Sequence, residues 1–234
     1  NSHNENLTLR GKPRARPVLR DTAHQNFMDL LLGGQLKPGL LVSQRELCEM
    51  TGSTIGSIRE ALKRLEAEGV ISLIPQRGVI VRELEEGEIN DVFETRKIIE
   101  VHAAQRFAEI GSQKLIVDIK QKTQEILERK TQTREDSISL SRERIAVDDL
   151  FHQTLIATLD NTVLDEIFER LRLQIQVSRL SVQPRFIDSR PALREHLVII
   201  EALENGNSTA AATAMLEHLE RAHSRAIGTE WKEI

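Results

Sequence analysis

The sequence predicts a mainly α-helical protein with a small β-hairpin in its N-terminal part and an antiparallel helical bundle after it. Apolar residues recur at helical spacing along most of the 234 residues. With only 12 Gly and 6 Pro, the chain has too few turn-forming residues for a β-rich fold. The exception is a pair of short apolar runs around Pro-Gln-Arg-Gly at 75–78, which predicts the hairpin.

Length and charge divide the chain into two domains and a short arm. A chain of this length exceeds the usual size of a single domain, and we expect a flexible basic arm at 1–17, a first domain at 18–83 and an all-helical domain at 84–234. Lys and Arg outnumber Asp and Glu up to residue 82, whereas acidic residues dominate the rest. The first domain therefore suits a polyanion. The arm either contacts phosphate or is a solvated tail.

The composition also narrows the cellular context. The single cysteine, Cys48, excludes an internal disulfide and fits a reducing cytosol. No apolar run reaches the roughly 20 residues that span a bilayer. We therefore expect a cytoplasmic protein without a membrane partner.

Three helices are expected in the first domain, the last two of them joined by a tight turn. Ser43 and Glu46 have the spacing of a capping box, in which the serine oxygen accepts from a backbone amide and the glutamate reaches back. Gly69 is a natural stop for the last helix. The predicted helices run from Val18 to Gly33-Gly34, from Ser43 to Met50 and from about Thr54 to Glu68.

Such a helix pair followed by a hairpin is typical of a winged helix-turn-helix. The N-terminus of the second helix in the pair is narrow enough to enter the DNA major groove, and its free amides favour phosphate. This helix carries Arg59, Lys63 and Arg64 on its outward face, and the hairpin tip presents Gln76 and Arg77. Helix-turn-helix segments also occur in proteins that bind no nucleic acid, but the hairpin and the basic charge together favour DNA binding.

Five motifs follow one another in this domain: Leu36-Lys37-Pro38-Gly39, Gln44-Arg45-Glu46-Leu47, Ile58-Arg59-Glu60-Ala61-Leu62, Leu65-Glu66-Ala67-Glu68-Gly69 and Pro75-Gln76-Arg77-Gly78-Val79. In these motifs the chain resembles the GntR family of bacterial transcription regulators. The resemblance implies DNA contacts at Arg45, Thr54, Arg59 and the Gly78 wing tip. The predicted DNA-contact residues are Arg45, Thr54, Ser57, Arg59, Gln76, Arg77 and Gly78.

The sequence departs from the family pattern at the start of the third helix. Where the family usually has Ser-Arg-Thr-Pro, this chain has Thr54-Ile55-Gly56-Ser57. Ile55 thus replaces the arginine that customarily reads a base. The resemblance therefore implies an altered operator sequence or weaker base readout at this position.

The second domain is expected to contain six helices, for which an antiparallel bundle is the most economical architecture. Its last two helices are separated by a Glu-Asn-Gly-Asn turn at 204–207. The helices are expected at about 88–110, 112–129, 139–159 and 163–181, with two more that begin near Pro191 and near Ser208.

Four polar side chains occupy predicted core positions of this bundle. Asp148 and His152 lie one turn apart on the apolar stripe of one helix, a spacing that allows both to bind one cation. His196 and His218 lie on the apolar stripes of the last two helices. A lone inward histidine is more often a satisfied core residue, but an unpaired carboxylate beside an imidazole is costly to bury. The four converging groups therefore predict a metal site.

Arg96 is a similar anomaly on the first helix of the bundle, between Val92 and Ile99. A guanidinium is always charged and prefers a planar anion. That anion is either the carboxylate of a ligand or the side chain of Glu100, one turn away.

The segments Asp148-Asp149-Leu150-Phe151-His152, Arg194-Glu195-His196 and Glu217-His218, together with Arg96-x-x-x-Glu100, resemble the FCD effector domain of the FadR-like branch of the GntR family. The resemblance implies a divalent metal ion, zinc or alternatively nickel, held by Asp148, His152, His196 and His218. It also implies a small organic acid that binds beside the ion, where Arg96 would pair with it.

Together these features predict a homodimeric transcription regulator that binds a palindromic DNA operator under the control of a carboxylate effector. One alternative is a regulator that senses the metal without an organic effector. Another is a metal-dependent enzyme, but the chain has no HExxH motif and no evident inward general base beyond the predicted ligands. We therefore expect a regulator and not an enzyme.

Overall fold

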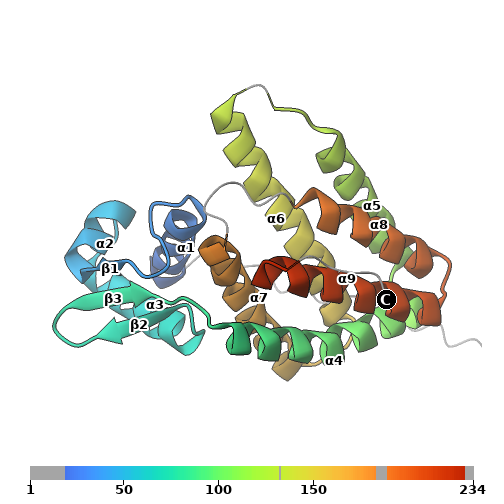
Figure 1. Cartoon of the computed structure of the whole chain (residues 1–234), viewed down its shortest axis with the longest axis horizontal. Coiled ribbons are helices and arrows are strands. Elements are labelled where there is room, and N and C mark those ends of the chain that lie inside the picture. The colour runs from blue at the N-terminus through green and yellow to red at the C-terminus, as the bar shows by residue number, and fades with distance from the viewer. Residues whose placement is uncertain (1–18, 132, 183–188, 230–234) are drawn as a thin grey trace, which may run out of the picture.

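The computed structural model describes residues 19–131, 133–182 and 189–229. In these ranges the chain is mainly helical with one small sheet, as the sequence predicts (Figure 1). The predicted basic arm at 1–17 lies outside the described residues. None of the described helices is long and apolar enough to cross a bilayer.

The N-terminal elements form a winged helix-turn-helix. They are α1 (Leu19–Leu32), β1 (Leu41–Val42), α2 (Gln44–Thr51), α3 (Ile55–Ala67), β2 (Ile71–Ile74) and β3 (Gly78–Val81). The predicted capping box starts α2: Ser43 Oγ accepts from the Glu46 amide at 3.2 Å, and Glu46 Oε2 accepts from the Ser43 amide at 2.8 Å. α2 packs against α3, and its Leu47 is buried in the core of this domain.

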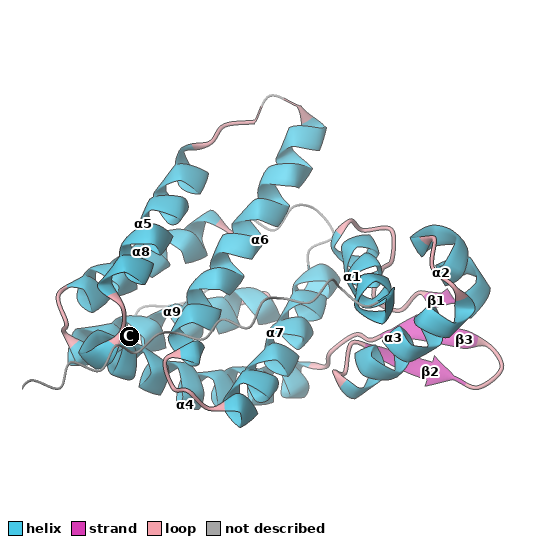
Figure 2. Ribbon diagram, turned by 180° about the vertical axis from the view of Figure 1, so that it is seen from behind, coloured by secondary structure: helices cyan, strands magenta, loops and turns pink. Residues whose placement is uncertain are grey.

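An antiparallel sheet of order β1-β3-β2 closes this domain (Figure 2). β2 and β3 form the predicted hairpin, whereas β1 is not predicted by the sequence. Leu41 of β1 faces Ile80, and Val42 faces Val79. Two residues are too few to reveal the alternation of a strand, so only the pairing with β3 defines β1.

Gly78 lies where β3 passes the end of β1. Its φ is +132°, and a Cβ added there would lie 2.2 Å from the carbonyl oxygen of Val42 and 3.0 Å from Cα of Ser43. Only glycine permits both this backbone conformation and this approach. Gly78 therefore has a structural reason to be glycine, whether or not it contacts DNA.

Replacing Gly78 by Ala is expected to lower the free energy of unfolding by roughly 1–3 kcal/mol, because the methyl group displaces β1 from β3 and strains the backbone. Urea unfolding of the full chain measures this change. Gly87→Ala is the control, since nothing lies within 4 Å of a Cβ added at Gly87, and it should not destabilise the protein. Equal stability of the two variants would contradict the packing argument.

The remaining elements form the helical bundle. They are α4 (Glu86–Ile110), α5 (Gln113–Glu128), α6 (Arg134–Ala157), α7 (Thr162–Val182), α8 (Arg190–Glu204) and α9 (Ser208–Ile227). α6 begins about one turn before the predicted start at residue 139. A capping box at Thr133 and Asp136 sets this earlier start, in a polar stretch where apolar spacing carries no signal.

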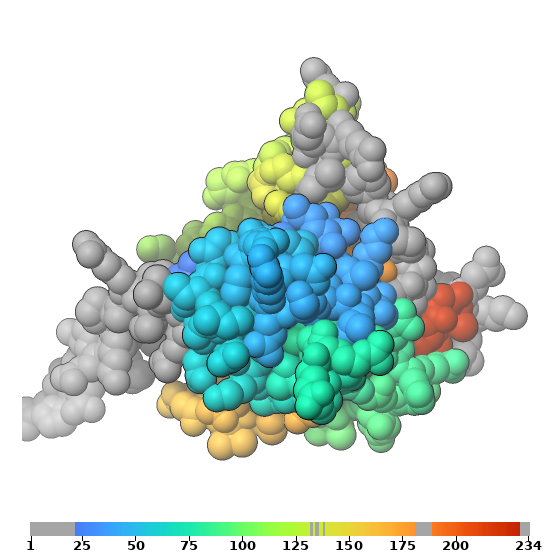
Figure 3. Space-filling model, turned by 90° about the vertical axis from the view of Figure 1, so that its left-hand side faces the viewer, coloured from blue at the N-terminus to red at the C-terminus, as the bar shows by residue number. Residues whose placement is uncertain are grey.

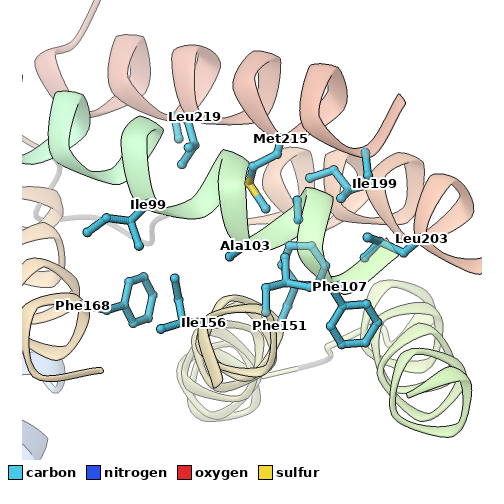
Figure 4. Close-up of a cluster of buried hydrophobic side chains, with 14 of the residues drawn as sticks. Ile99, Ala103, Phe107, Phe151, Ile156, Phe168, Ile199, Leu203, Met215 and Leu219 are labelled. Atoms are coloured by element: carbon cyan, nitrogen blue, oxygen red, sulfur yellow. The ribbon is translucent and has the colours of Figure 1, made fainter. Parts of the chain in front are cut away.

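The bundle core draws apolar side chains from all six of these helices. Figure 4 shows Phe107 of α4, Phe151 of α6 and Phe168 of α7 pointing into it, with Leu203 and Met215 from α8 and α9. Polar residues in the same interior are unusual, because each needs a hydrogen-bond or ionic partner among these apolar side chains.

α7 belongs to both parts of the molecule. Phe168, Leu171 and Ile175 lie in the bundle core, whereas Leu173 and Val177 lie in the core of the winged domain. Figure 1 shows α7 between α1 and the rest of the bundle. A helix of the bundle therefore completes the core of the N-terminal domain.

Candidate functional site

Three histidines from three helices meet inside the bundle. His152 lies on α6, His196 on α8 and His218 on α9, and their side chains are buried. Each offers a ring nitrogen, and these atoms all lie within 4.8 Å of one another. Nε2 of His196 is 3.3 Å from Nε2 of His218. Two nitrogens bound to one tetrahedral zinc ion, with bonds of about 2.1 Å, lie roughly 3.4 Å apart, so this spacing fits a shared ion.

Asp148, the fourth predicted residue, faces the same point from one turn before His152. Its Oδ1 lies 3.6 Å from Nε2 of His196 and has no hydrogen-bond partner among the described residues. Burial by itself raises the pKa of Asp148, but neighbouring positive charge, first of all that of Arg179, outweighs burial and holds that pKa well below its usual value. An ionised, buried oxygen without a partner is costly, and a cation at this point would satisfy it.

Two carboxylates contact the Nδ1 atoms of two of the histidines and so orient their rings. Oε2 of Glu195 lies 2.7 Å from Nδ1 of His218, and Glu100 contacts Nδ1 of His152. Because an ionised carboxylate only accepts hydrogen bonds, both Nδ1 atoms carry the proton, so Nε2 is the nitrogen that each ring can offer to a metal ion. Carboxylates commonly fix metal-binding histidines in this way.

The electrostatics keep these carboxylates ionised and favour the neutral form of His196 and His218. Burial raises the pKa of Glu100, but Arg96 and His152 outweigh it and bring that pKa to about 2. Burial lowers the pKa of His218 to about 4 and lowers that of His196 well below its usual value. Neutral imidazoles are the form that binds a metal.

His196 departs from the pattern of its two neighbours. Its Nδ1 has no hydrogen-bond partner among the described residues. Instead its ring stacks on Phe151, with centroids 4.1 Å apart. Packing, and not a carboxylate, holds this ring in place.

Sequence reasoning did not assign Glu195 and Glu100 to the candidate site. Glu195 directly precedes His196, so it lies off the apolar stripe that marked the histidine. The spacing of Arg96 and Glu100, one turn apart, identifies Glu100 only as a partner of Arg96. The signal that could have found both is their place in the Arg-Glu-His and Arg-x-x-x-Glu motifs.

Arg96 is buried and ion-paired with Glu100. This is the internal salt bridge that was one of the two alternatives for Arg96. Its Nη2 also lies 3.4 Å from both ring nitrogens of His152. The guanidinium is therefore next to the histidine cluster, and its pairing with Glu100 does not by itself test a role in ligand binding.

The predicted DNA-contact residues lie on the winged domain, whose blue-to-teal surface faces the viewer in Figure 3. Arg45, Thr54, Arg59, Gln76 and Arg77 are exposed, and Ser57 and Gly78 are partly exposed. Arg45 lies on α2, Thr54 caps the start of α3, Ser57 and Arg59 lie on α3, and the other three lie on the wing. A DNA partner can therefore reach all of them.

Contacts within the domain join these three elements into one surface. Nε of Arg59 on α3 donates to Oε1 of Gln44 on α2 at 3.2 Å. The wing also lies beside the start of α2, because Gly78 packs against Ser43. Thr54 caps α3 by accepting from the Ser57 amide at 3.2 Å, so its hydroxyl has a structural role as well.

The fold and the site together define a winged helix-turn-helix protein joined to a helical domain with a candidate metal centre. Comparison with protein-family models assigns both halves: residues 19–81 match the bacterial regulatory proteins of the gntR family, and residues 91–221 match the FCD domain. The chain belongs to the GntR family and carries an FCD domain. It is a transcription regulator with a DNA-binding domain and an effector domain, as its sequence motifs predict.

Known relatives of the chain are transcription regulators. It is 24% identical over 189 residues to the HTH-type transcriptional repressor RspR of Escherichia coli, across 79% of this chain and 78% of that protein. It is also 24% identical over 179 residues to the gluconate operon transcriptional repressor of Bacillus subtilis, across 74% and 71% of the two chains. These relatives support the prediction that the chain is not an enzyme.

Solved structures show the same fold. The E. coli McbR/YncC structure has a TM-score of 0.75 and 19% identity, covering 91% of this chain and 99% of that one. A putative GntR regulator from Rhodococcus sp. RHA1 has a TM-score of 0.73 and 20% identity with the same coverage. At this identity the likeness shows the fold alone.

Proposed function

We propose that a small carboxylate metabolite controls operator binding by this regulator, and that the metabolite binds at a divalent metal ion held by Asp148, His152, His196 and His218. The observation that carries the proposal is the partnerless Oδ1 of Asp148, which faces neutral imidazoles in a buried interior. A bound cation satisfies all these groups at once. Without one, the interior holds an ionised carboxylate oxygen that has no hydrogen-bond donor among the described residues, which is costly.

The donor set favours zinc, with nickel as the alternative. Imidazole nitrogen suits both ions, and carboxylate oxygen is a common additional ligand. When bound, the ion supplies positive charge and, if a coordination position stays open, a site for an effector oxygen. Arg96, 3.4 Å from the His152 ring, adds a second positive group that suits a carboxylate.

α7 is the element that we propose connects the metal site to the DNA-binding domain. Nη1 of Arg179 on α7 lies 3.5 Å from Oδ2 of Asp148. On the same helix, Leu173 and Val177 are packed in the core of the winged domain. A change in the charge or position of Asp148 therefore acts on a helix that the DNA-binding domain needs for its own core. Only a difference in effector affinity between two arrangements of α7 can shift their populations.

The DNA-binding end acts as one half of a symmetric pair in this proposal. A homodimer with two-fold symmetry presents two copies of α3 to a palindromic operator. Phosphate contacts supply most of the affinity, and base contacts select the sequence. The spacing between the two α3 helices is then the quantity that the effector changes.

Replacing Glu195 by Gln is expected to weaken metal binding by roughly 10–100-fold, because His218 loses the charged partner that orients it. Competition with a chromophoric chelator measures the affinity. Glu217→Gln is the matched control: Glu217 is exposed, pairs with Arg221 and directly precedes His218. If both variants bind the metal equally, Glu195 has no orienting role.

The proposal is tested by measuring operator affinity while metal and organic acid are varied separately. The operator is selected from a randomised duplex library, and fluorescence anisotropy follows its binding to the zinc-loaded protein. A panel of small mono- and dicarboxylic acids is then added at fixed zinc. We expect one class of acid to change the affinity by about 5–150-fold, the usual range of allosteric coupling. An operator affinity that no acid changes would overturn effector control.

The pairing of Arg96 with Glu100 favours a second candidate, in which the metal itself is the signal. In that case the guanidinium is already neutralised and no organic acid is needed. Operator affinity would then depend on zinc occupancy alone. Removing zinc with a chelator and then restoring it, without any organic acid, tests this. A response to acid at fixed zinc excludes this alternative.

A further inference from the structure

Ile55 is an exposed apolar side chain at the first position of α3. It is 45% exposed and belongs to neither the winged-domain core nor the residues that pack against it. Its neighbours Thr54, Ser57 and Arg59 are polar. Packing inside the chain therefore covers only part of the Ile55 side chain and leaves the rest open to a partner.

The surroundings leave Ile55 free to contact a partner. The Thr54 and Ser57 hydroxyls lie 3.0 Å apart and are engaged in the helix cap. Gly56 adds no side chain, and the nearest atom to a Cβ built there is 3.9 Å away. The first turn of α3 can therefore come close to a surface, with Ile55 as its projecting group.

We propose that Ile55 selects the operator sequence by packing against the 5-methyl group of a thymine in the major groove. The first residues of a recognition helix face base edges. Isoleucine has no hydrogen-bond donor or acceptor, and the thymine methyl is the one apolar group that a base pair presents in that groove. The operator half-site then requires a T·A pair opposite the start of α3. This inference depends on DNA binding by α3 and not on the metal or effector proposal.

The test removes only the methyl group. The full-length protein selects its operator from a randomised duplex library, and each thymine in that operator is then replaced singly by deoxyuridine. Fluorescence anisotropy at fixed salt measures the affinity for each duplex. At one position in each half-site, we expect the wild-type protein to lose about 4-fold, which corresponds to the loss of one buried methyl contact.

Variants assign that loss to Ile55. Ile55→Ala should bind the thymine and deoxyuridine operators equally, and Ile55→Arg should select guanine at the same position, since arginine pairs with its O6 and N7. Val198→Ala, at an exposed apolar residue on α8, should keep the full thymine preference. The inference is overturned if the selected operators share no thymine, if deoxyuridine is tolerated at every position, or if Ile55→Ala retains the loss.

Discussion

The His196→Ala variant is expected to lose stable binding of a divalent ion, with metal content falling from one ion per chain to near zero. His196 is fully buried, and its Nε2 lies 3.3 Å from His218 and 3.6 Å from Asp148. Its removal deletes the donor at the centre of the site. The metal affinity should fall by more than the roughly 10–100-fold that follows loss of a residue that only orients a metal ligand. Elemental analysis after dialysis against zinc measures the content.

A thermal readout separates loss of the ion from loss of the fold. An ion that binds only the folded state stabilises it and therefore raises the melting temperature. The stabilisation is about 2.7 kcal/mol when the free ion concentration is 100 times the dissociation constant. The wild-type melting temperature should rise with added zinc, and that of His196→Ala should not. His102→Ala, at an exposed histidine of α4, should behave as wild type. Full zinc content in a folded His196→Ala protein would refute the site.

The Arg59→Ala variant is expected to lose specific operator binding, the second large effect. Arg59 is exposed on α3, and its contact with Gln44 holds it at the junction of α2 and α3. A good bidentate contact between arginine and a base is worth about 1–3 kcal/mol. The proposed homodimer loses two such contacts, so the affinity should fall by roughly 30-fold to 25,000-fold. Gel-shift titration with the selected operator measures this loss.

Removal of a positive charge elsewhere provides the control. Arg106 on α4 is exposed and paired with Glu109 at 3.1 Å, so Arg106→Ala changes the net charge equally but leaves the winged domain intact. It should retain operator binding. If Arg59→Ala binds the operator as tightly as Arg106→Ala, α3 does not read this DNA at Arg59. A loss that is equal for operator and random duplex would instead assign Arg59 to phosphate.

Local signals in the sequence predicted the elements whose cause is local. The Ser43-Glu46 capping box sets the start of α2, because its hydrogen bonds join residues three apart. The stripes that contain His152, His196 and His218 predicted buried positions, since helical periodicity alone decides which side of a helix faces the core. The GntR and FCD motifs were also legible in the sequence, and the family models confirm them.

The misses have equally physical causes. β1 exists only because β3 offers it a hydrogen-bonding edge. α6 starts early because a cap, and not apolar spacing, begins it. Neither signal lies in the periodicity from which the helices were predicted.

By itself, then, the sequence determined a winged helix-turn-helix, a helical bundle and the buried faces on which Asp148 and the three histidines lie. Only the tertiary structure decided that Glu195 and Glu100 stand behind two of those histidines, that Arg96 pairs with Glu100, and that Leu173 and Val177 of α7 complete the core of the other domain. The reason is the range of the interactions. Capping and amphipathicity act within a few residues, whereas these contacts depend on how separate helices pack.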